Sequence, residues 1–123
     1  MSILNIAIFD DVVYARGESF NMKGLSVKVF EHADHMKAAI EAKYHVIFMD
    51  YAMGPDHLNG AEATKELRDG GFAGKIVAIS SDPRANQLII EAGANEALPT
   101  KAVLRSFLVH LAKEHAKTLS SRA

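Results

Sequence analysis

The sequence contains no cysteine and no tryptophan. Without cysteine there can be no disulfide bond, no thiolate nucleophile and no cysteine-bound zinc. Charge of neither sign dominates, because 14 Lys and Arg oppose 15 Asp and Glu. A near-neutral chain without a basic cluster has no electrostatic basis for nucleic-acid binding, so we expect no direct contact with DNA or RNA.

Long hydrophobic runs are missing as well. No apolar segment approaches the roughly 20 residues that span a bilayer, so no membrane association is expected. The first residues, MSILNIAIFDD, lack the charged start and the cleavage site of a signal peptide, and a cytoplasmic location is therefore expected. With 123 residues, of which 49% are hydrophobic, the chain suits one globular domain. We place this domain at residues 1–119, followed by a polar tail at residues 120–123.

Apolar runs alternate regularly with segments of helical spacing, which predicts five βα units. The expected strands are Ile3–Phe9, Leu25–Phe30, His45–Met49, Ile76–Ile79 and Glu96–Leu98. The expected helices are a short one from Val13, then Ala33–Ala42, Gly60–Arg68, Pro83–Ala92 and about Ala102–Lys117.

The strand sequences also indicate the order of the sheet. A strand covered on both faces is continuously apolar, whereas an edge strand alternates or is short. Leu25–Phe30 alternates and Glu96–Leu98 is short, so the second and fifth strands are the expected edges. With right-handed crossovers, the prediction is a doubly wound five-stranded parallel sheet of order 2-1-3-4-5, the flavodoxin-like α/β three-layer sandwich.

Polar side chains follow four of the five strands. The first strand is followed by Asp10 and Asp11, the third by Asp50, the fourth by Ser80, and Lys101 comes just after the fifth. Carboxyl ends of parallel strands meet at one edge of the sheet, so these groups should converge. Clustered carboxylates that repel one another suit Mg²⁺, and a lysine with a hydroxyl suits a phosphoryl group. An Asp after a strand is also a common helix N-cap, and that alternative stays open for Asp10 and Asp11.

These residues carry a resemblance to the receiver domains of two-component response regulators, in particular the single-domain, chemotaxis-regulator-like members. The resemblance covers nearly the whole chain and rests on IAIFDD, VIFMDYAM, VAISS, EAGANEAL and Lys101. It implies that Asp50 is the phosphoacceptor, that Ser80 is the switch hydroxyl and that Lys101 contacts the phosphoryl group. It also implies a Mg²⁺ site formed by Asp10, Asp11, Asp50 and the carbonyl of Ala52.

The sequence departs from the family pattern in the loop after Asp50. Pro55 and Gly60 follow Asp50 by five and ten residues, one and two more than is usual in the family. The segment Gly54–Asn59 is therefore longer, and we expect Asp56 and His57 near the mouth of the site, as solvated side chains. A further pair, His32 and His35, is expected to be solvated at a helix start rather than to share a metal.

Two more departures concern the switch. The aromatic residue that the family carries on its fifth strand is missing, since Ala97 and Leu98 are the only candidates for that position. The usual Lys-Pro is Lys101-Ala102 here. These departures keep open an alternative in which the chain is an atypical pseudo-receiver, a phosphorylation-independent interaction module. A Mg²⁺ phosphohydrolase is disfavoured, because its acids are usually two apart, and a flavin-binding module is disfavoured by the three acids.

The resemblance implies a signalling phosphoprotein of a phosphorelay, which is no enzyme beyond its own phosphorylation and dephosphorylation. The implied donor is a sensor histidine kinase or a histidine phosphotransfer protein. The implied output is a protein target, or a second copy in a homodimer, bound through the face formed by Pro83–Ala92, Glu96–Leu98 and Ala102–Lys117. Outward apolar contacts on that face are expected at Ile90, Leu98 and Val109.

Overall fold

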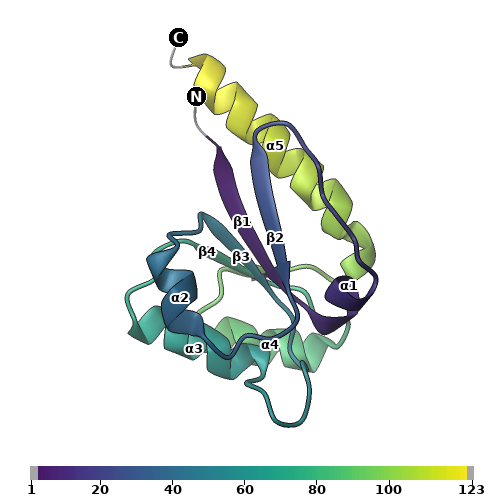
Figure 1. Ribbon diagram of the computed structural model, residues 1–123, viewed down its shortest axis with the longest axis vertical. Helices are drawn as coiled ribbons and strands as arrows, with labels where there is room; N and C mark the ends of the chain where they lie inside the picture. The colour runs from purple at the N-terminus through teal and green to yellow at the C-terminus, as the bar shows by residue number, and fades with distance from the viewer. Residues whose placement is uncertain (1–2, 122–123) are drawn as a thin grey trace.

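The computed structural model, which describes residues 3–121, has a five-stranded parallel sheet at its centre (Figure 1). The strands are β1 (Leu4–Phe9), β2 (Leu25–Phe30), β3 (Val46–Met49), β4 (Lys75–Ala78) and β5 (Glu96–Ala97). Their order is β2-β1-β3-β4-β5, and all pairs are parallel. The sheet order predicted from the sequence is therefore confirmed.

Helices cover both faces of the sheet, so the predicted doubly wound α/β class and three-layer sandwich are also confirmed. The helices are α1 (Asp11–Ala15), α2 (Met36–Glu41), α3 (Gly60–Asp69), α4 (Pro83–Ala92), the 3-10 helix η1 (Lys101–Val103) and α5 (Leu104–Ser121). Figure 1 shows α1 and α5 on one side and α2, α3 and α4 on the other. Within the described part of the chain, no helix is both long enough and apolar enough to cross a membrane.

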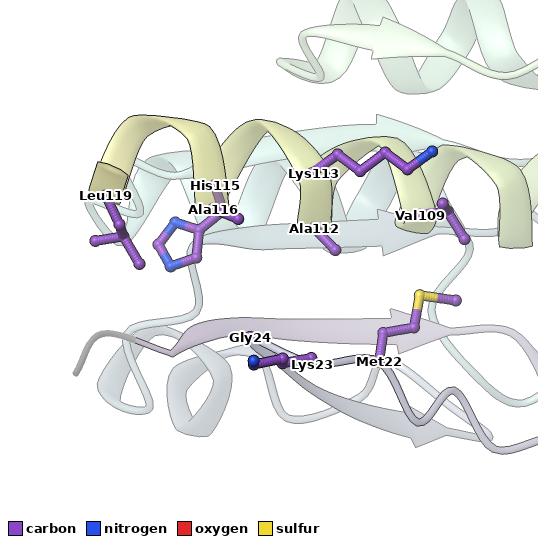
Figure 2. Close-up of a pocket in the computed structure, with 9 residues that line it drawn as sticks. All are labelled: Met22, Lys23, Gly24, Val109, Ala112, Lys113, His115, Ala116 and Leu119. Carbon is purple, nitrogen blue, oxygen red and sulfur yellow. The ribbon is translucent and has the colours of Figure 1, made fainter. Parts of the chain in front are cut away.

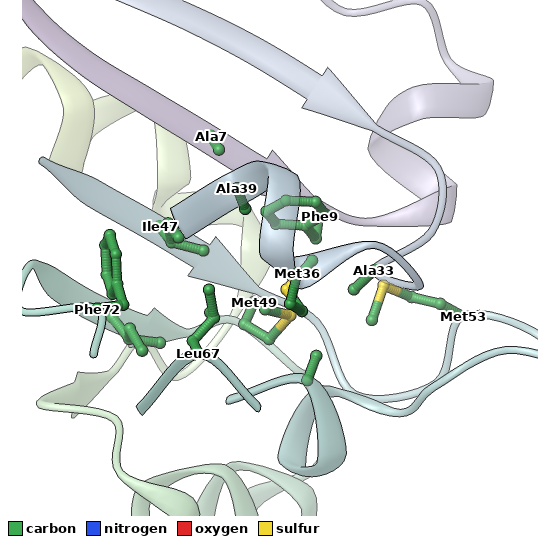
Figure 3. Close-up of a cluster of buried hydrophobic side chains, with 12 residues drawn as sticks. Ala7, Phe9, Ala33, Met36, Ala39, Ile47, Met49, Met53, Leu67 and Phe72 are labelled. Atoms are coloured by element: carbon green, nitrogen blue, oxygen red, sulfur yellow. The ribbon is translucent and has the colours of Figure 1, made fainter. Parts of the chain in front are cut away.

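The alternation of side chains along the strands divides the apolar core into two clusters. Ala7 and Phe9 of β1 face α2 and α3, where they join the cluster drawn in Figure 3. Ile6 and Ile8 of the same strand face α1 and α5. All four are nearly inaccessible. Because both faces of β1 are buried, the end of this strand is held firmly where Asp10 follows it.

The expected helix boundaries hold best where a clear cap exists. Asp82 caps α4, which spans Pro83–Ala92 as predicted. Helix α1 begins two residues before the expected Val13, because the carboxylate of Asp10 accepts hydrogen bonds from the backbone at its start. Helix α5 continues to Ser121, into the expected polar tail, and residues 122–123 of that tail lie outside the described residues.

The prediction that Leu98 points outward is wrong. Strand β5 ends at Ala97, one residue earlier than expected, and the N–H of Leu98 donates to the carbonyl of Ala78 at 2.8 Å. Its side chain is 7% exposed and joins the cluster beneath α5. A strand of two residues is too short for its alternation to be visible in the sequence. Ile90 is half-buried, and Val109 is exposed as expected.

Arg68 joins α3 to the segments around β4 and β5. Its guanidinium donates to the carbonyls of Gly93, Phe72 and Gly74 and to Oδ1 of Asn95, at 2.8–2.9 Å. A planar fork with five N–H donors is needed to serve four acceptors in these directions, and lysine has only one nitrogen.

Arg68→Lys is expected to lower the free energy of unfolding by about 2 kcal/mol, because several hydrogen bonds to a charged group are lost. Urea denaturation followed by circular dichroism measures this. The matched control is Arg84→Lys on the exposed side of α4, which should stay within about 0.5 kcal/mol of the parent. Equal effects of the two substitutions would show that the Arg68 contacts contribute little.

A groove of about 400 Å³ lies between the outer part of α5 and the turn before β2 (Figure 2). Its lining includes Met22, Val109, Ala112 and Leu119. The turn contacts the start of β1, since the N–H of Leu4 donates to the carbonyl of Gly24. The groove is therefore at the opposite end of the sheet from the strand ends that carry the polar residues described next.

Candidate functional site

Asp10 serves two purposes with its two carboxylate oxygens. Oδ1 accepts hydrogen bonds from the N–H groups of Val12 and Val13, at 2.9 and 3.1 Å, and so caps α1. Oδ2 lies 3.0 Å from Nζ of Lys101. The N-cap and the site, which the sequence left as alternatives for Asp10, are therefore both present in one side chain.

Lys101 also contacts the second buried acid. Its Nζ donates a hydrogen bond to Oδ2 of Asp50 at 3.1 Å. Asp50 follows β3, and its own N–H donates to the carbonyl of Phe9 in β1. The lysine reaches both acids from the start of η1, whose first turn is closed by the N–H of Ala102 donating to Thr100. One cation thus bridges the ends of the neighbouring strands β1 and β3.

The predicted acidic cluster is present. Carboxylate oxygens of Asp10, Asp11 and Asp50 lie within 4.8 Å of one another. Asp10 is fully buried, and Asp50 is 5% exposed. Lys101 is the cation beside the buried Oδ2 of Asp10, at 3.0 Å.

The charge balance of the site fits a bound divalent cation. Three clustered carboxylates share the single ammonium of Lys101, and like charges this close repel one another unless further positive charge is supplied. Mg²⁺ prefers carboxylate and carbonyl oxygens and keeps several waters, which suits a site with one half-buried acid, Asp11, at its mouth. Ala52, whose carbonyl the resemblance adds to this set, is exposed in the loop after Asp50.

The electrostatics of the site reflect three acids and one base. Burial, followed by the charge of Asp10, raises the pKa of Asp50, although Lys101 partly opposes this. Burial alone would lower the pKa of Lys101, but Asp10 and Asp50 together outweigh it and raise the pKa of the lysine. Lys101 is therefore charged at neutral pH. The ionised form of Asp50 is destabilised by burial and by Asp10 unless a further cation is bound.

Asp50→Asn is expected to stabilise the protein at neutral pH in EDTA, by about 1 kcal/mol. The folded pKa of Asp50 lies above its unfolded value, so stability falls as the pH rises through the window between the two. The amide removes this penalty. The gain is small because the contact with Lys101, which offsets much of the roughly 4 kcal/mol repulsion of a like-charged pair about 4 Å apart, is also lost.

Thermal unfolding from pH 4 to 8 measures this effect, with Asp56→Asn in the same exposed loop as the control. The difference between parent and Asp50→Asn should shrink toward acidic pH. It should also shrink when Mg²⁺ is added. A variant less stable than the parent at pH 7 would contradict the direction of the shift.

Solved structures of other proteins share the sheet order and helix arrangement of this chain. A CheY-like response regulator receiver domain from Methanospirillum hungatei JF-1 aligns with 99% of this chain and 100% of its own, at 20% identity and a TM-score of 0.71. The chain has the receiver fold. A two-component response regulator of the LuxR family from Aurantimonas sp. SI85-9A1 aligns with 89% of this chain and 81% of its own, at 24% identity and a TM-score of 0.68.

A third similar structure, a LuxR-family DNA-binding response regulator from Staphylococcus aureus, aligns with 78% of this chain and 85% of its own, at 15% identity and a TM-score of 0.56. No protein-family model and no curated protein matches the sequence. At 15–24% identity, the structural likeness concerns the receiver fold, and the roles of individual residues rest on the site geometry.

The end of β4 in this receiver fold is tied to its neighbours by a residue that the sequence did not single out. Asn86 of α4 is 7% exposed. Its Oδ1 accepts from the N–H of Ser80, and its Nδ2 donates to the carbonyls of Ser80 and Leu98. Ser80 Oγ accepts from the N–H of Asp82 at 3.1 Å, and a hydroxyl in this state still has a proton to donate. A movement at Ser80 thus has a direct hydrogen-bonded connection to the residue after β5.

The lengthened loop of this receiver fold is not solvated as expected. The imidazole of His57 pairs with the carboxylate of Asp34 in the loop after β2. It also stacks on His32, with ring centroids 3.4 Å apart. The expectations of a solvated His57 and a solvated His32 are therefore wrong, and each side chain is about one-third exposed. Asp56 and His35 are exposed as expected.

Proposed function

We propose that this chain is a phosphoacceptor of two-component signalling, acting in the cytoplasm, with Asp50 as the residue that receives the phosphoryl group. The observation that carries the proposal is the position of Lys101, whose Nζ lies 3.0 Å from Asp10 and 3.1 Å from Asp50 at the ends of β1 and β3. One positive charge at this place can serve both the acceptor and the oxygens of an incoming phosphoryl group.

The reaction that we propose for Asp50 is the transfer of a phosphoryl group to its carboxylate. An oxygen of Asp50 attacks phosphorus, the bond from phosphorus to the donor nitrogen or oxygen breaks, and the leaving group departs with that electron pair. The product is an acyl phosphate on Asp50. The acyl phosphate carries more negative charge than the carboxylate it replaces, so the ammonium of Lys101 beside Asp50 would offset part of the added charge.

Asp10, Asp11 and Asp50 would hold Mg²⁺, with the carbonyl of Ala52 as a further oxygen ligand. A bound Mg²⁺ would neutralise the charge that develops on the transferring phosphoryl oxygens. The chain's own contributions are the Asp10 carboxylate, fixed by its two backbone hydrogen bonds, and the Lys101 ammonium. Ser80, tied by Asn86 at the end of β4, supplies a hydroxyl donor toward the modified side chain.

The donor would be a sensor histidine kinase or a histidine phosphotransfer protein, and the output would be a protein target, or a second copy, on the face formed by α4, β5 and α5. Leu88 on α4 is a large apolar side chain exposed there, at 46%. Val109 of α5 is exposed too, but it lies beside Met22 in the groove between α5 and the turn before β2. The chain would catalyse only its own phosphorylation and dephosphorylation.

The test is intact-mass spectrometry of the protein incubated with acetyl phosphate and Mg²⁺. A gain of one phosphoryl group is expected, and it should disappear in EDTA and in Asp50→Asn. Asp56→Asn in the same loop should be phosphorylated like the parent.

A lack of any gain, in a folded protein that binds Mg²⁺, would overturn the proposal and favour the phosphorylation-independent module. Phosphorylation that survives in Asp50→Asn would assign the acceptor to another residue. The complete set of acids and the bridging lysine argue against the phosphorylation-independent module, since retaining buried carboxylates that repel one another costs stability.

A further inference from the structure

The loops after β2 and β3 are fastened to each other by a side-chain cluster outside the acidic site. Asp34 accepts a hydrogen bond from the backbone N–H of Leu58 at 3.0 Å and pairs with Nδ1 of His57. Since β1 lies between β2 and β3 in the sheet, this contact crosses the end of the strand that carries Asp10. We call the cluster of His32, Asp34 and His57 the loop clasp.

His32 is the third member of the loop clasp and contributes a second imidazole. Its ring lies parallel to that of His57, at an interplanar angle of 5°. Metal-ligating atoms of His32, Asp34 and His57 all lie within 4.8 Å of one another. The three side chains are 29–31% exposed, so they are open to a small ion but shielded from most of the solvent.

The loop backbone holds His57 in this place. The N–H of His57 donates to the carbonyl of Gly54 at 3.2 Å, which closes a turn. Gly54 has φ +112°, and a Cβ added there would lie 3.0 Å from Cδ2 of the His57 ring. The loop thus has a glycine where the imidazole packs against its backbone. On the other side, the Leu58 N–H orients the Asp34 carboxylate, the kind of support that metal ligands receive from outer groups.

A fastening between two loops requires only Asp34 with His57 or Leu58, and the second imidazole is unnecessary for it. Two imidazoles and one carboxylate form a donor set preferred by Zn²⁺ and similar transition-metal ions, whereas Mg²⁺ prefers oxygen alone. The ionised form of Asp34 is favoured, because its hydrogen bond from His57 and that from Leu58 lower its pKa. Glu31, whose carboxylate lies 3.8 Å from Nδ1 of His32, adds negative charge beside the cluster.

We propose that His32, Asp34 and His57 form a binding site for a transition-metal dication of the Zn²⁺ class, separate from the acidic cluster of Asp10, Asp11 and Asp50. Water completes the coordination. The two rings turn out of their parallel stack on binding, so that their nitrogen lone pairs converge on the ion. The bound ion joins the loop after β2 to the loop after β3. This site stands whether or not Asp50 accepts a phosphoryl group.

The test is a titration of the untagged full chain with ZnCl₂, followed by calorimetry and by NMR of the imidazole nitrogens. One Zn²⁺ per chain is expected, with the largest shifts at His32 and His57. His57→Ala and His32→Phe should each weaken binding at least tenfold. The phenylalanine keeps a ring to stack on His57 while it removes the ligand nitrogen, so a loss of affinity in this variant is not a loss of packing.

Two controls separate the loop clasp from other sites. His35→Ala removes an exposed histidine three residues from His32 and should leave Zn²⁺ affinity unchanged. Asp50→Asn should also leave it unchanged, because the acidic cluster is a different site. Parent-like affinity in both His57→Ala and His32→Phe would overturn the proposal, as would loss of binding in Asp50→Asn alone. Failure of the parent chain to bind Zn²⁺ at micromolar concentration would overturn it as well, leaving a loop fastening without metal.

Discussion

Gly60→Ala is expected to lower the free energy of unfolding by about 3 kcal/mol or more. A Cβ at Gly60 would lie 2.0 Å from the backbone oxygen of Asp50, 2.9 Å from its carbonyl carbon and 3.0 Å from Cδ1 of Ile89. Backbone at the end of β3 cannot retreat without moving Asp50. On helix propensity alone, alanine at the start of α3 would stabilise the protein by about 1 kcal/mol. A loss of stability would therefore show that the clash with Asp50 outweighs the helix propensity of alanine.

Gly70→Ala is the matched control, because Gly70 is at the other end of the same helix. Its nearest obstacle is the flexible end of the Ile40 side chain, which can move aside. We expect a change of at most about 1 kcal/mol in urea denaturation. Similar losses in the two variants would show that α3 does not approach Asp50 as closely as the structure has it. Mg²⁺ affinity should fall in Gly60→Ala and stay constant in Gly70→Ala.

The second large effect is expected for Lys101→Met, which keeps the length and apolar stem of the side chain but removes its charge. Two buried carboxylates then face each other without a cation, and removal of one partner from a buried ion pair is strongly destabilising. Since Lys101 is 22% exposed, we expect a loss of about 2–3 kcal/mol in EDTA rather than the full amount for a dry site. Mg²⁺ should restore a large part of it, and the Mg²⁺ affinity should rise.

Urea denaturation with EDTA or with Mg²⁺ measures this, and the double variant Lys101→Met/Asp50→Asn tests the cause. If repulsion of Asp10 and Asp50 is responsible, the double variant should be more stable than the sum of the two single changes predicts. The control is Lys65→Met, which breaks an exposed ion pair with Asp69 on α3 and should cost at most about 0.5 kcal/mol. A loss that Mg²⁺ does not reverse would indicate packing rather than charge.

The strand order and the meeting of the three acids could be predicted from the sequence because both follow from short-range patterns. Continuous or alternating apolar residues show which strands are central, and the residues after parallel strands must share one edge. Asp10, Asp50 and Lys101 each follow a strand closely. The position of the strand in the sheet therefore largely determines where each of these side chains lies. The same reasoning fails for Leu98, because two residues of β5 leave no alternation to detect.

The loop clasp and the role of Asn86 could not be predicted in this way. The partner of His57 is 23 residues away in another loop, and no periodicity links the two. The only hint in the sequence was the residue types present. A lengthened loop contains a histidine, and the segment after β2 carries His32 and Asp34. For Asn86 the signal was an amide next to the buried Ala85 on α4, where an apolar residue would otherwise be expected.

The closure of the β3–α3 loop at Gly60 explains why its extra length is tolerated. The N–H of Gly60 donates to the carbonyl of Tyr51 at 2.8 Å, so the loop returns to the point where it left the sheet. The entropy of closing a flexible loop grows only with the logarithm of its length, and two added residues cost about 0.2 kcal/mol. The single hydrogen bond from Leu58 to Asp34 contributes about 1 kcal/mol and offsets this several times over. Conformational entropy therefore sets almost no limit on lengthening this loop, and variants with added residues should fold equally well as long as Gly60 stays against Asp50 and Leu58 keeps its hydrogen bond to Asp34.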